Sequence, residues 1–249
     1  MDIRICDNCD FDWAIELVKK HKLGIEFQTF YDPFIKNLSK TLKYQKEQTA
    51  KIKHKSLHAP FWELNTGTKM PGLRKETMKM YNFAYKCAKE LGCDCIVVHN
   101  GYYPGTYRYT GWLKRTVEFW QEFFADKDNS ITIMLENQFE KDSELMKLVV
   151  DSVADKRLKV CLDVGHANCN SDMTVYKWIK TLGKRIGYMH LHNNHGKDAG
   201  DEHLGITNGT IDIKKVIKLA KEHCPRAILA VETAKDVEKS IDILKRLTK

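Results

Sequence analysis

Residues 131–163, "ITIMLENQFEKDSELMKLVVDSVADKRLKVCLD", show the pattern that decides the fold. The segment begins with the short apolar run "ITIMLE" (131–136), continues through a helical stretch and ends with a second run, "LKVCLD" (158–163). Short apolar runs rich in β-branched residues that alternate with helical stretches are typical of βα units and a parallel sheet. The segment therefore predicts a strand, a helix and a second strand parallel to the first.

The same unit recurs along the whole chain. Six further runs predict strands, and each is followed by a helical stretch; they are "IRIC" (3–6), "GIEFQ" (24–28), "KSLHA" (55–59), "CIVVH" (95–99), "IGYMHL" (186–191) and "AILAVE" (227–232). Eight strand–helix pairs in 249 residues fit a closed (β/α)8 barrel, the TIM barrel, better than an open doubly wound sheet. No linker or composition break interrupts the pattern, so we expect one α/β domain over residues 1–249.

Composition and charge exclude several classes of protein. The chain is 43% hydrophobic and 30% charged, and no apolar run approaches the roughly 20 residues that a membrane span needs. The net charge of +8 comes mostly from dispersed lysines, which favours a solvated surface over a nucleic-acid patch. The amino terminus has no export signal, so we expect a cytoplasmic protein with eight reduced cysteines and no membrane partner.

Ionisable residues stand where the predicted strands end. In TIM barrels the chemistry lies at the carboxyl ends of the strands. In six consecutive predicted strands, the last or the second-to-last residue can bind a divalent metal. These residues are His58, His99, Glu136, Asp163 with His166 just beyond, His190 and Glu232. So many carboxylates and imidazoles in one barrel mouth would repel one another or lose solvation unless a cation neutralised them. The pattern therefore predicts a metal site at this end of the barrel.

The segment "YMHLHNNHGKDAGDEHLGITNG" (188–209) extends this prediction. Asp201 and His203 are two residues apart, so on an extended segment both side chains can reach one ion. With the strand-end residues they bring the number of potential ligands to nine. One ion takes about three to six protein ligands, so we expect one to three divalent ions, Zn2+ or Mn2+.

Seven short motifs also carry a resemblance to a known group of proteins. They occur in order at the predicted strand ends and read "SLHAPF", "VVHNG", "IMLEN", "CLDVGHAN", "MHLHNN", "DEHLGITNGTID" and "AVET". Over nearly the whole chain they resemble the xylose isomerase-like superfamily of barrels. This superfamily joins sugar isomerases and epimerases with the family 2 apurinic endonucleases, such as endonuclease IV.

The two branches imply different metal sites. The resemblance to endonuclease IV implies three zinc ions, held by His58, His99 and Glu136, by Glu136, Asp163, His190 and Glu232, and by His166, Asp201 and His203. The resemblance to the epimerases implies one manganese-type ion, held by Glu136, Asp163, His190 and Glu232, with the two glutamates also serving as acid and base. All nine positions are filled in this chain.

Other loops depart from the endonuclease pattern. The segments "ENQFEKD", "HANCNSD" and "RICDNCDFDW" differ from those with which endonuclease IV contacts nucleic acid. In "DEHLGITNGTID", Thr207 and Asn208 replace the usual glycine and glutamate, which affects the shape of the loop more than its ligands. "HLHNNHG" is similar to the "HLHDNDG" of barrels grouped with sugar phosphate isomerases and epimerases. The loops therefore favour a small molecule over nucleic acid as the partner.

Three hypotheses for function follow. The favoured one is a metal-dependent isomerase or epimerase of a small sugar or sugar phosphate, in which Glu136 and Glu232 transfer the proton. The side chains expected to contact the substrate are those of His192, Asn100, Asn137, Phe61 and Trp62. The close alternative is an endonuclease IV-like enzyme or a small-molecule phosphoesterase with two or three zinc ions. The third is a non-catalytic binding module, and the sequence indicates neither the exact substrate nor the oligomeric state.

Overall fold

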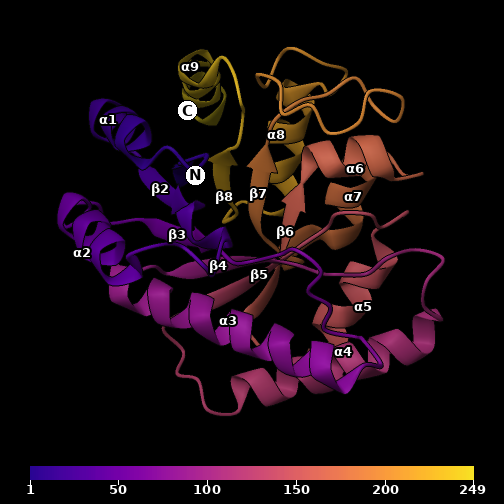
Figure 1. The fold of residues 1–249 in the computed structure, drawn as a ribbon. Coiled ribbons are helices and arrows are strands. Elements are labelled where there is room, and N and C mark those ends of the chain that lie inside the picture. Colours follow the sequence, from indigo (N-terminus) through magenta and orange to yellow (C-terminus); the bar gives the residue numbers. More distant parts are fainter.

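A computed structural model describes residues 1–249, in which eight parallel strands close into a barrel surrounded by helices (Figure 1). The elements follow one another in the order β1 (Ile3–Cys6), α1 (Phe11–His21), β2 (Gly24–Phe27), η1 (Thr29–Tyr31), α2 (Leu38–Gln48), β3 (Lys55–His58), α3 (Pro71–Leu91), β4 (Cys95–His99), α4 (Tyr109–Phe124), β5 (Thr132–Glu136), α5 (Glu144–Val153), β6 (Leu158–Asp163), α6 (Val164–Asn170), α7 (Val175–Leu182), η2 (Gly183–Arg185), β7 (Ile186–Leu191), α8 (Ile213–His223), β8 (Ile228–Val231) and α9 (Val237–Thr248). The predicted TIM barrel is confirmed, with each strand next to its neighbour in sequence and β8 pairing with β1.

The predicted strand bounds agree with the structure to within one residue at either end. β2, β3, β5 and β8 are each slightly shorter than predicted. Glu232 consequently lies one residue beyond β8, in the loop before α9. It still belongs to the carboxyl-terminal rim, where its backbone N–H donates to the carbonyl oxygen of Leu191 at 3.2 Å.

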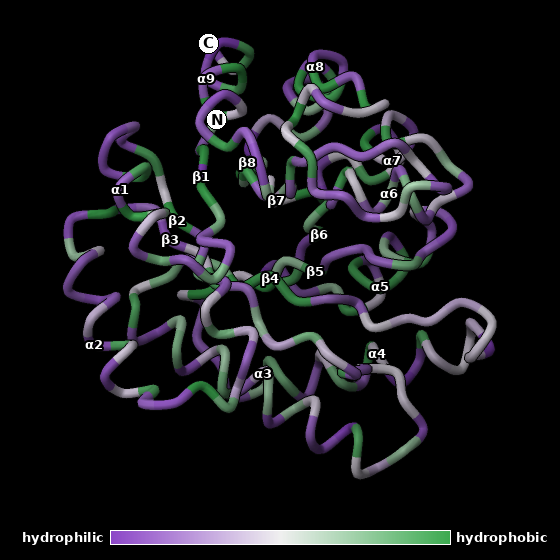
Figure 2. Tube along the Cα trace, turned by 45° about the horizontal axis from the view of Figure 1, so that its top comes forward, coloured by the Kyte–Doolittle hydropathy of each residue, from purple (hydrophilic) through white to green (hydrophobic).

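The buried side chains form two separate cores, because each strand is covered on both faces. A cluster of 59 residues fills the space between the strands and the surrounding helices. Along the tube in Figure 2 the helices alternate between hydrophobic and hydrophilic residues, as amphipathic helices do when they pack one side on a sheet. A cluster of seven fills the inside of the barrel: Cys6, Cys95, Val97, Met134, Cys161, Tyr188 and Ala230.

Strand register brings the last residues of neighbouring strands to the same level. His99 pairs with Glu136 across β4 and β5, and Asp163 pairs with His190 across β6 and β7. Because residues two apart on a strand share a face, these side chains lie on the same face as Val97, Met134 and the other members of the inner cluster. The strand-end residues therefore project into the mouth of the barrel.

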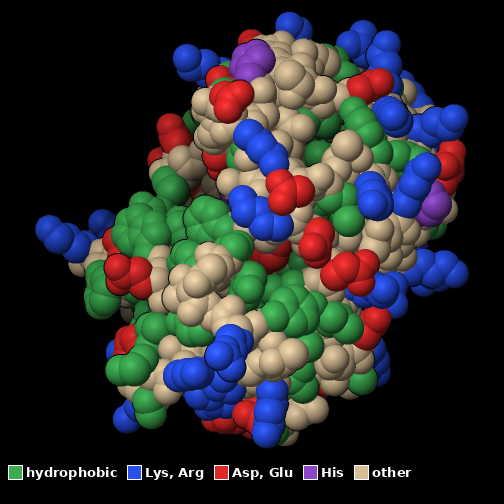
Figure 3. All heavy atoms as spheres, turned by 90° about the vertical axis from the view of Figure 1, so that its right-hand side faces the viewer, with side chains coloured by type: hydrophobic (Ala, Val, Ile, Leu, Met, Phe, Trp, Pro, Cys, Tyr) green, Lys and Arg blue, Asp and Glu red, His purple; other side chains and the backbone are tan.

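The surface and the cysteines complete the description. Figure 3 shows Lys and Arg side chains interspersed with Asp and Glu over one face, with no continuous basic stripe on that face. All eight cysteines are free, and all but Cys9 are buried. No helix combines the length and the hydropathy that a membrane crossing requires.

Candidate metal centre

Glu136, the last residue of β5, lies at the centre of the barrel mouth. Its side chain is 1% exposed, and histidines from four other elements surround its two oxygens. Oε2 lies 3.2 Å from Nε2 of His58 and 3.5 Å from Nε2 of His99, while Oε1 lies 3.1 Å from Nδ1 of His190 and 3.4 Å from Nδ1 of His166. A single buried carboxylate therefore links the ends of β3, β4 and β7 with the start of α6.

Asp163 joins the end of β6 to the start of α6. Its side chain caps the helix by accepting a hydrogen bond from the backbone N–H of His166 at 2.6 Å. A second oxygen contact, at 3.1 Å, is to Nε2 of His192. Since the cap fixes the first turn of the helix, Asp163 also determines where the imidazole of His166 lies.

The loop after β7 brings Asp201 and His203 back to the same mouth. Asp201 Oδ2 lies 2.8 Å from Nε2 of His203 and 3.1 Å from Nε2 of His166. His203 has a φ of 47°, in the left-handed region that few residues other than glycine adopt. Its Nδ1–H donates to the backbone carbonyl of Glu232 at 2.9 Å, which ties this strained loop to the end of β8.

The hydrogen bonds of the histidines match those of metal ligands. Ligating histidines usually donate their outer ring N–H to a carbonyl or carboxylate, which leaves the inner nitrogen for the ion. His58 donates from Nδ1 to the carbonyl of Ala59, and His166 donates from Nδ1 to the carbonyl of Asn137, both at 2.9 Å. His203 does the same toward Glu232, so in all three the Nε2 faces the carboxylates of the site.

The geometry also includes Glu26, a residue that the sequence analysis did not select. Its carboxylate lies beneath the site on β2, fully buried, at 3.0 and 3.1 Å from Nε2 of His190. His190 therefore directs Nε2 to Glu26 and Nδ1 to Glu136, Glu232 and Asp163, at 3.1, 3.4 and 3.7 Å. A carboxylate in the middle of the apolar strand "GIEF" was the signal available in the sequence, since an unpaired charge there would be costly.

The nine predicted ligands form one continuous group. In two sets of three, the potential ligand atoms all lie within 4.8 Å of one another: His58, His99 and Glu136, and His166, Asp201 and His203. Between these sets lie Asp163, His190 and Glu232, joined by the contacts of His190. Nitrogen and carboxylate donors of this kind suit Zn2+ or Mn2+, so the residues fit the divalent ion that the sequence predicted.

Burial and charge act in opposite directions on the pKa values of the site. Burial lowers the pKa of His99 to about 3, so this imidazole is neutral at pH 7, and its buried Nδ1 has no hydrogen-bond partner. Burial also disfavours a charged His203, but the hydrogen bond to Asp201 and the charge of Glu232 raise its pKa to about 9. In the three-ion arrangement, His203 would have to lose this proton to bind an ion, so binding would release protons and weaken as the pH falls.

The two glutamates expected to transfer protons differ in their surroundings. Burial raises the pKa of Glu232, against the charges of His190 and His203. Burial acts in the same direction on Glu136, but the charge of His190 and the hydrogen bonds from His166 and His190 outweigh it and hold the pKa of Glu136 well below its usual value. Two carboxylates of one site thus have pKa values shifted in opposite directions.

A cavity of about 390 Å³ opens above these residues. Phe61 and Trp62, two of the predicted substrate contacts, line it, and the side chain of Tyr31 packs against both, with ring centroids 5.8 and 5.2 Å away. The wall also includes four residues that the sequence analysis missed, namely Cys9, Gln28, Tyr31 and Gln138. No lysine or arginine lines the cavity.

The other three predicted substrate contacts, Asn100, Asn137 and His192, lie outside the lining of this cavity. Asn137 exchanges two hydrogen bonds with the backbone of Asp163, at 2.9 and 3.0 Å. The amide of Asn100 donates to Glu140 at 2.7 Å. These side chains hold the rim in place, and their contact with substrate stays a prediction.

His192 packs behind the site. Its ring stacks on that of His203 with centroids 4.0 Å apart, and its other side meets Gly165, where an added Cβ would lie 1.9 Å from the imidazole. Only glycine fits at residue 165 with this histidine in place. His192 therefore supports Asp163 and His203 from a fully buried position.

Comparisons with known proteins found relatives of this barrel. An uncharacterised protein of Methanocaldococcus jannaschii, MJ1311, is 30% identical over 206 residues, which cover 76% of this chain and 68% of that protein. A crystal structure of a D-tagatose 3-epimerase-like protein is 26% identical with a TM-score of 0.82, over 99% of this chain and 97% of the other. The TTHB071 protein of Thermus thermophilus, from a crystal soaked with ZnCl2, has the same fold, with 22% identity and a TM-score of 0.81 over 99% of this chain and 98% of its own.

The barrel, its rim of histidines and carboxylates and the relatives are consistent with one family. The family model described as xylose isomerase-like TIM barrel matches residues 14–247, which is nearly the whole of the barrel. The resemblance of the strand-end motifs is thereby confirmed, and the chain belongs to the xylose isomerase-like TIM barrel family.

Proposed function

We propose that the protein is a divalent-metal-dependent epimerase or isomerase of a small, unphosphorylated sugar. The observation that carries the proposal is the placement of two glutamates, Glu136 and Glu232, on the wall of one cavity, with His190 in contact with both. Epimerisation next to a carbonyl requires one group to take a proton from carbon and another to return a proton to the opposite face. Two carboxylates in one cavity can divide these tasks.

Four residues would hold the metal for this reaction: Glu136, Asp163, His190 and Glu232. All four are buried and linked by the contacts of His190, so they form a compact donor set. When bound, the cation would polarise a ketone oxygen and the neighbouring hydroxyl and so acidify the proton on the carbon that bears this hydroxyl. Glu26 would keep Nδ1 of His190 turned toward the other three ligands, because it engages the opposite nitrogen.

The chain itself supplies the positioning and the proton transfer. Gln28 donates a hydrogen bond from Nε2 to Oε1 of Glu232, which orients that carboxylate at the wall of the cavity. The rings of Tyr31, Phe61 and Trp62 lie together on the wall, where an aromatic surface suits the C–H face of a sugar and excludes water. One glutamate then removes the proton and the other returns it.

The absence of cations in the wall favours an unphosphorylated substrate. A phosphate dianion is usually held by arginine, lysine or several backbone amides, and neither side chain lines this cavity. The sequence did not distinguish a sugar from a sugar phosphate as the substrate. The composition of the cavity wall is the reason for choosing the uncharged sugar.

The comparisons support the proposal at the level of reaction type. The D-tagatose 3-epimerase-like structure covers nearly the whole chain at 26% identity, and its name likens that protein to an epimerase. The structure soaked with ZnCl2 shares the fold and is compatible with a divalent ion in this family.

The direct test is a panel of ketoses and their phosphate esters, incubated with protein loaded with Mn2+ or Zn2+, with products separated by chromatography. We expect at least one free ketose to be converted faster than its phosphate ester, and conversion of the phosphate ester alone would contradict the substrate class.

The alternative, a phosphoric ester hydrolase, is favoured by one specific observation. The sets His58, His99 and Glu136, and His166, Asp201 and His203, lie on either side of the central ligands and provide donors for further ions. Two or three metals can activate a water and stabilise both oxygens of a displacement. Elemental analysis distinguishes the candidates: close to one ion per chain is expected here, and close to three zinc ions per chain with phosphatase or nuclease activity would favour the hydrolase.

A further inference from the structure

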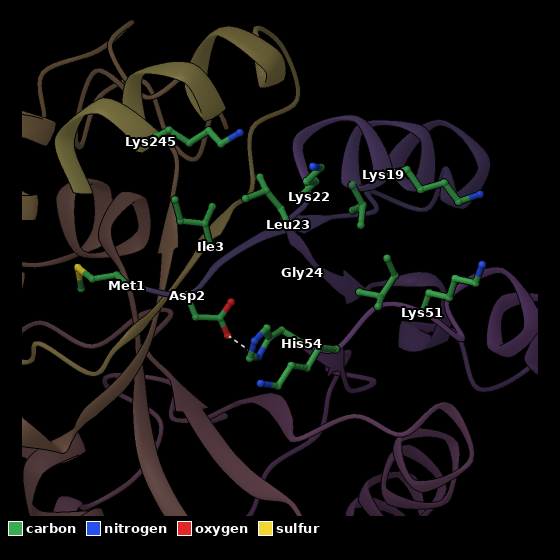
Figure 4. Close-up of a pocket in the computed structure, with 13 residues that line it drawn as sticks. Met1, Asp2, Ile3, Lys19, Lys22, Leu23, Gly24, Lys51, His54 and Lys245 are labelled. Carbon is green, nitrogen blue, oxygen red and sulfur yellow. Dashed lines mark ion pairs between the residues drawn. The ribbon is translucent and has the colours of Figure 1, made fainter. Parts of the chain in front are cut away.

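A second cavity, of about 750 Å³, lies at the opposite end of the barrel (Figure 4). It is formed where β1 and β2 begin, beside the end of α1, the residues 51–54 that precede β3, and α9. Aliphatic side chains cover part of its wall, among them Ile3, Val18, Leu23 and Ile52. The cavity is thus separated from the metal centre by the length of the strands.

Five lysines line this cavity, and none of them is paired with a carboxylate. They are Lys19, Lys22, Lys51, Lys53 and Lys245. Two of them donate to neutral groups: Lys245 Nζ to the carbonyl of His21 at 3.1 Å, and Lys19 Nζ to Oε1 of Gln48 at 3.4 Å. Elsewhere on the surface lysines do form ion pairs, as Lys46 does with Glu90 at 2.6 Å.

The one acidic residue of the lining is already engaged. Asp2 binds the buried guanidinium of Arg4 at 2.9 Å and faces His54 at 3.5 Å. Asp94 shares the same guanidinium at 2.7 Å, so Asp2 can still offset one of the five lysine charges but not the others. The cavity has an excess of positive charge, which favours an anion and disfavours a cationic ligand.

The lysines come from separate segments around the opening. In Figure 4, Lys245 extends from α9 toward Lys22, while Lys19 and Lys51 point to the same side of the cavity. Charges spread in this way around a large opening suit a ligand with several negative charges in a row better than a single small anion. Lysine binds phosphate as a mobile point charge, without the fixed fork of arginine.

We propose that this amino-terminal cavity binds a small polyphosphate anion, either free or as the phosphate chain of a nucleotide. The lining offers aliphatic side chains but no phenylalanine, tyrosine or tryptophan ring on which a base could stack, so the phosphate chain provides the recognition. Because the cavity lies away from the proposed sugar site, the anion would bind as a separate ligand and not as the substrate. This inference does not depend on the proposed function.

Isothermal titration calorimetry with sodium tripolyphosphate at low ionic strength tests the proposal. We expect saturable binding of one ion per chain, weaker binding of orthophosphate, and a loss of affinity as salt screens the charges. The triple variant Lys19→Ala, Lys51→Ala, Lys245→Ala should bind at least about tenfold more weakly, as expected when charge-assisted contacts of roughly 1.5 kcal/mol or more are removed. ATP should bind with an affinity similar to that of tripolyphosphate if the phosphate chain alone is recognised.

A charge-matched control separates this site from general electrostatics. Lys156→Ala, Lys180→Ala and Lys218→Ala remove three exposed lysines that do not line the cavity, so this variant should bind tripolyphosphate like the native protein. If tripolyphosphate also removes bound metal, the heat of that reaction should be the same in the native protein and in both triple variants. Equal affinity of the two triple variants, or no saturable binding by the native protein, would overturn the proposal. Binding of ATP without binding of tripolyphosphate would overturn the assignment to the phosphate chain.

Discussion

The two mouths of the barrel carry opposite chemistry although the same strands lead to both. At the carboxyl end, strand-end carboxylates and histidines line a cavity whose wall contains no lysine or arginine, and Glu26 is buried beneath them. At the amino end, five unpaired lysines surround a larger cavity, and its one carboxylate, Asp2, is bound to Arg4. The net charge of +8 therefore says little about the proposed active site, since the cavity with five lysines lies at the other end of the barrel from the proposed metal ligands.

The inside of the barrel keeps the two mouths apart. Arg4, 1% exposed, binds Asp2 and Asp94 with its guanidinium at the amino end. Above it the hydroxyls of Tyr188 and Ser56 lie 2.8 Å apart within the inner core. Since packed side chains fill this layer, a ligand in one mouth has no open path to the other. Substitutions at the carboxyl mouth should accordingly affect metal binding and catalysis.

The largest effect is expected from Glu232→Gln. The substitution keeps the size of the side chain but removes a carboxylate that can carry a proton, so kcat should fall by about 10²–10⁴-fold. The measurement is the rate of ketose epimerisation with saturating metal. Glu222→Gln, at an exposed position of α8, is the matched control and should leave the rate unchanged. Activity retained in the Glu232 variant would refute the proposed site.

His203→Ala distinguishes the one-metal site from a trinuclear one. His203 contacts Asp201 and the backbone of Glu232 but is not among the four proposed ligands, so we expect a loss of activity of about 10–100-fold and unchanged metal content. Activity and metal content are measured on the same preparation. Loss of bound zinc together with nearly all activity would instead indicate that the set His166, Asp201 and His203 holds an ion of its own.

Glu26→Gln should weaken metal binding without removing a proposed ligand. The amide can still accept a hydrogen bond from Nε2 of His190, but it lacks the charge that makes the imidazole a stronger ligand, so affinity should fall by about 10-fold or more. Competition with a chromophoric chelator measures the affinity, and the spectrum of the Co2+ form reports the ligand geometry. Glu140→Gln, another buried carboxylate, contacts Asn100 and not His190 and serves as the control. Equal metal affinity in the two variants would exclude the positioning role.

The smallest effect is expected from Trp62→Ala. Trp62 is 62% exposed at the edge of the sugar cavity, so its removal should raise KM by a few fold, the size of an aromatic contact of roughly 0.5–1.5 kcal/mol, and leave kcat nearly unchanged. Steady-state kinetics with the best ketose separates the two constants. A large fall in kcat with no change in KM would show that the ring acts on the reaction and not on binding.

Local patterns in the sequence were sufficient to predict the barrel and the residues that meet at its mouth, whose role as metal ligands remains a prediction. Strand ends could be placed to within one residue, and the carboxyl ends of parallel strands must converge, so His99, Glu136 and Asp163 could be grouped without coordinates. Glu26 was not predicted as part of the site, because it lies inside its strand and potential ligands were expected at the strand ends. Its carboxylate contacts His190 across the barrel, from β2 to β7, and no local pattern shows this contact.

Other features depend on side-chain direction or on distant segments. Asn137 stands next to Glu136 in the sequence, yet its amide turns to the backbone of Asp163 and not to the cavity. The lysines of the amino mouth lie in segments as far apart as Lys19, Lys51 and Lys245, so in the sequence they look like dispersed surface charges. The pairing of β1 with β8 and with β2, and of β2 with β3, brings these segments together.

The most direct test of the proposed function is solvent proton exchange, followed by NMR in D2O with the metal-loaded protein and a free ketose. The account predicts that deuterium enters at the carbon next to the carbonyl as the epimer forms, and that Glu232→Gln suppresses both the exchange and the conversion. A native protein that binds metal but exchanges no carbon-bound proton in any ketose, while it hydrolyses phosphate esters, would contradict the account.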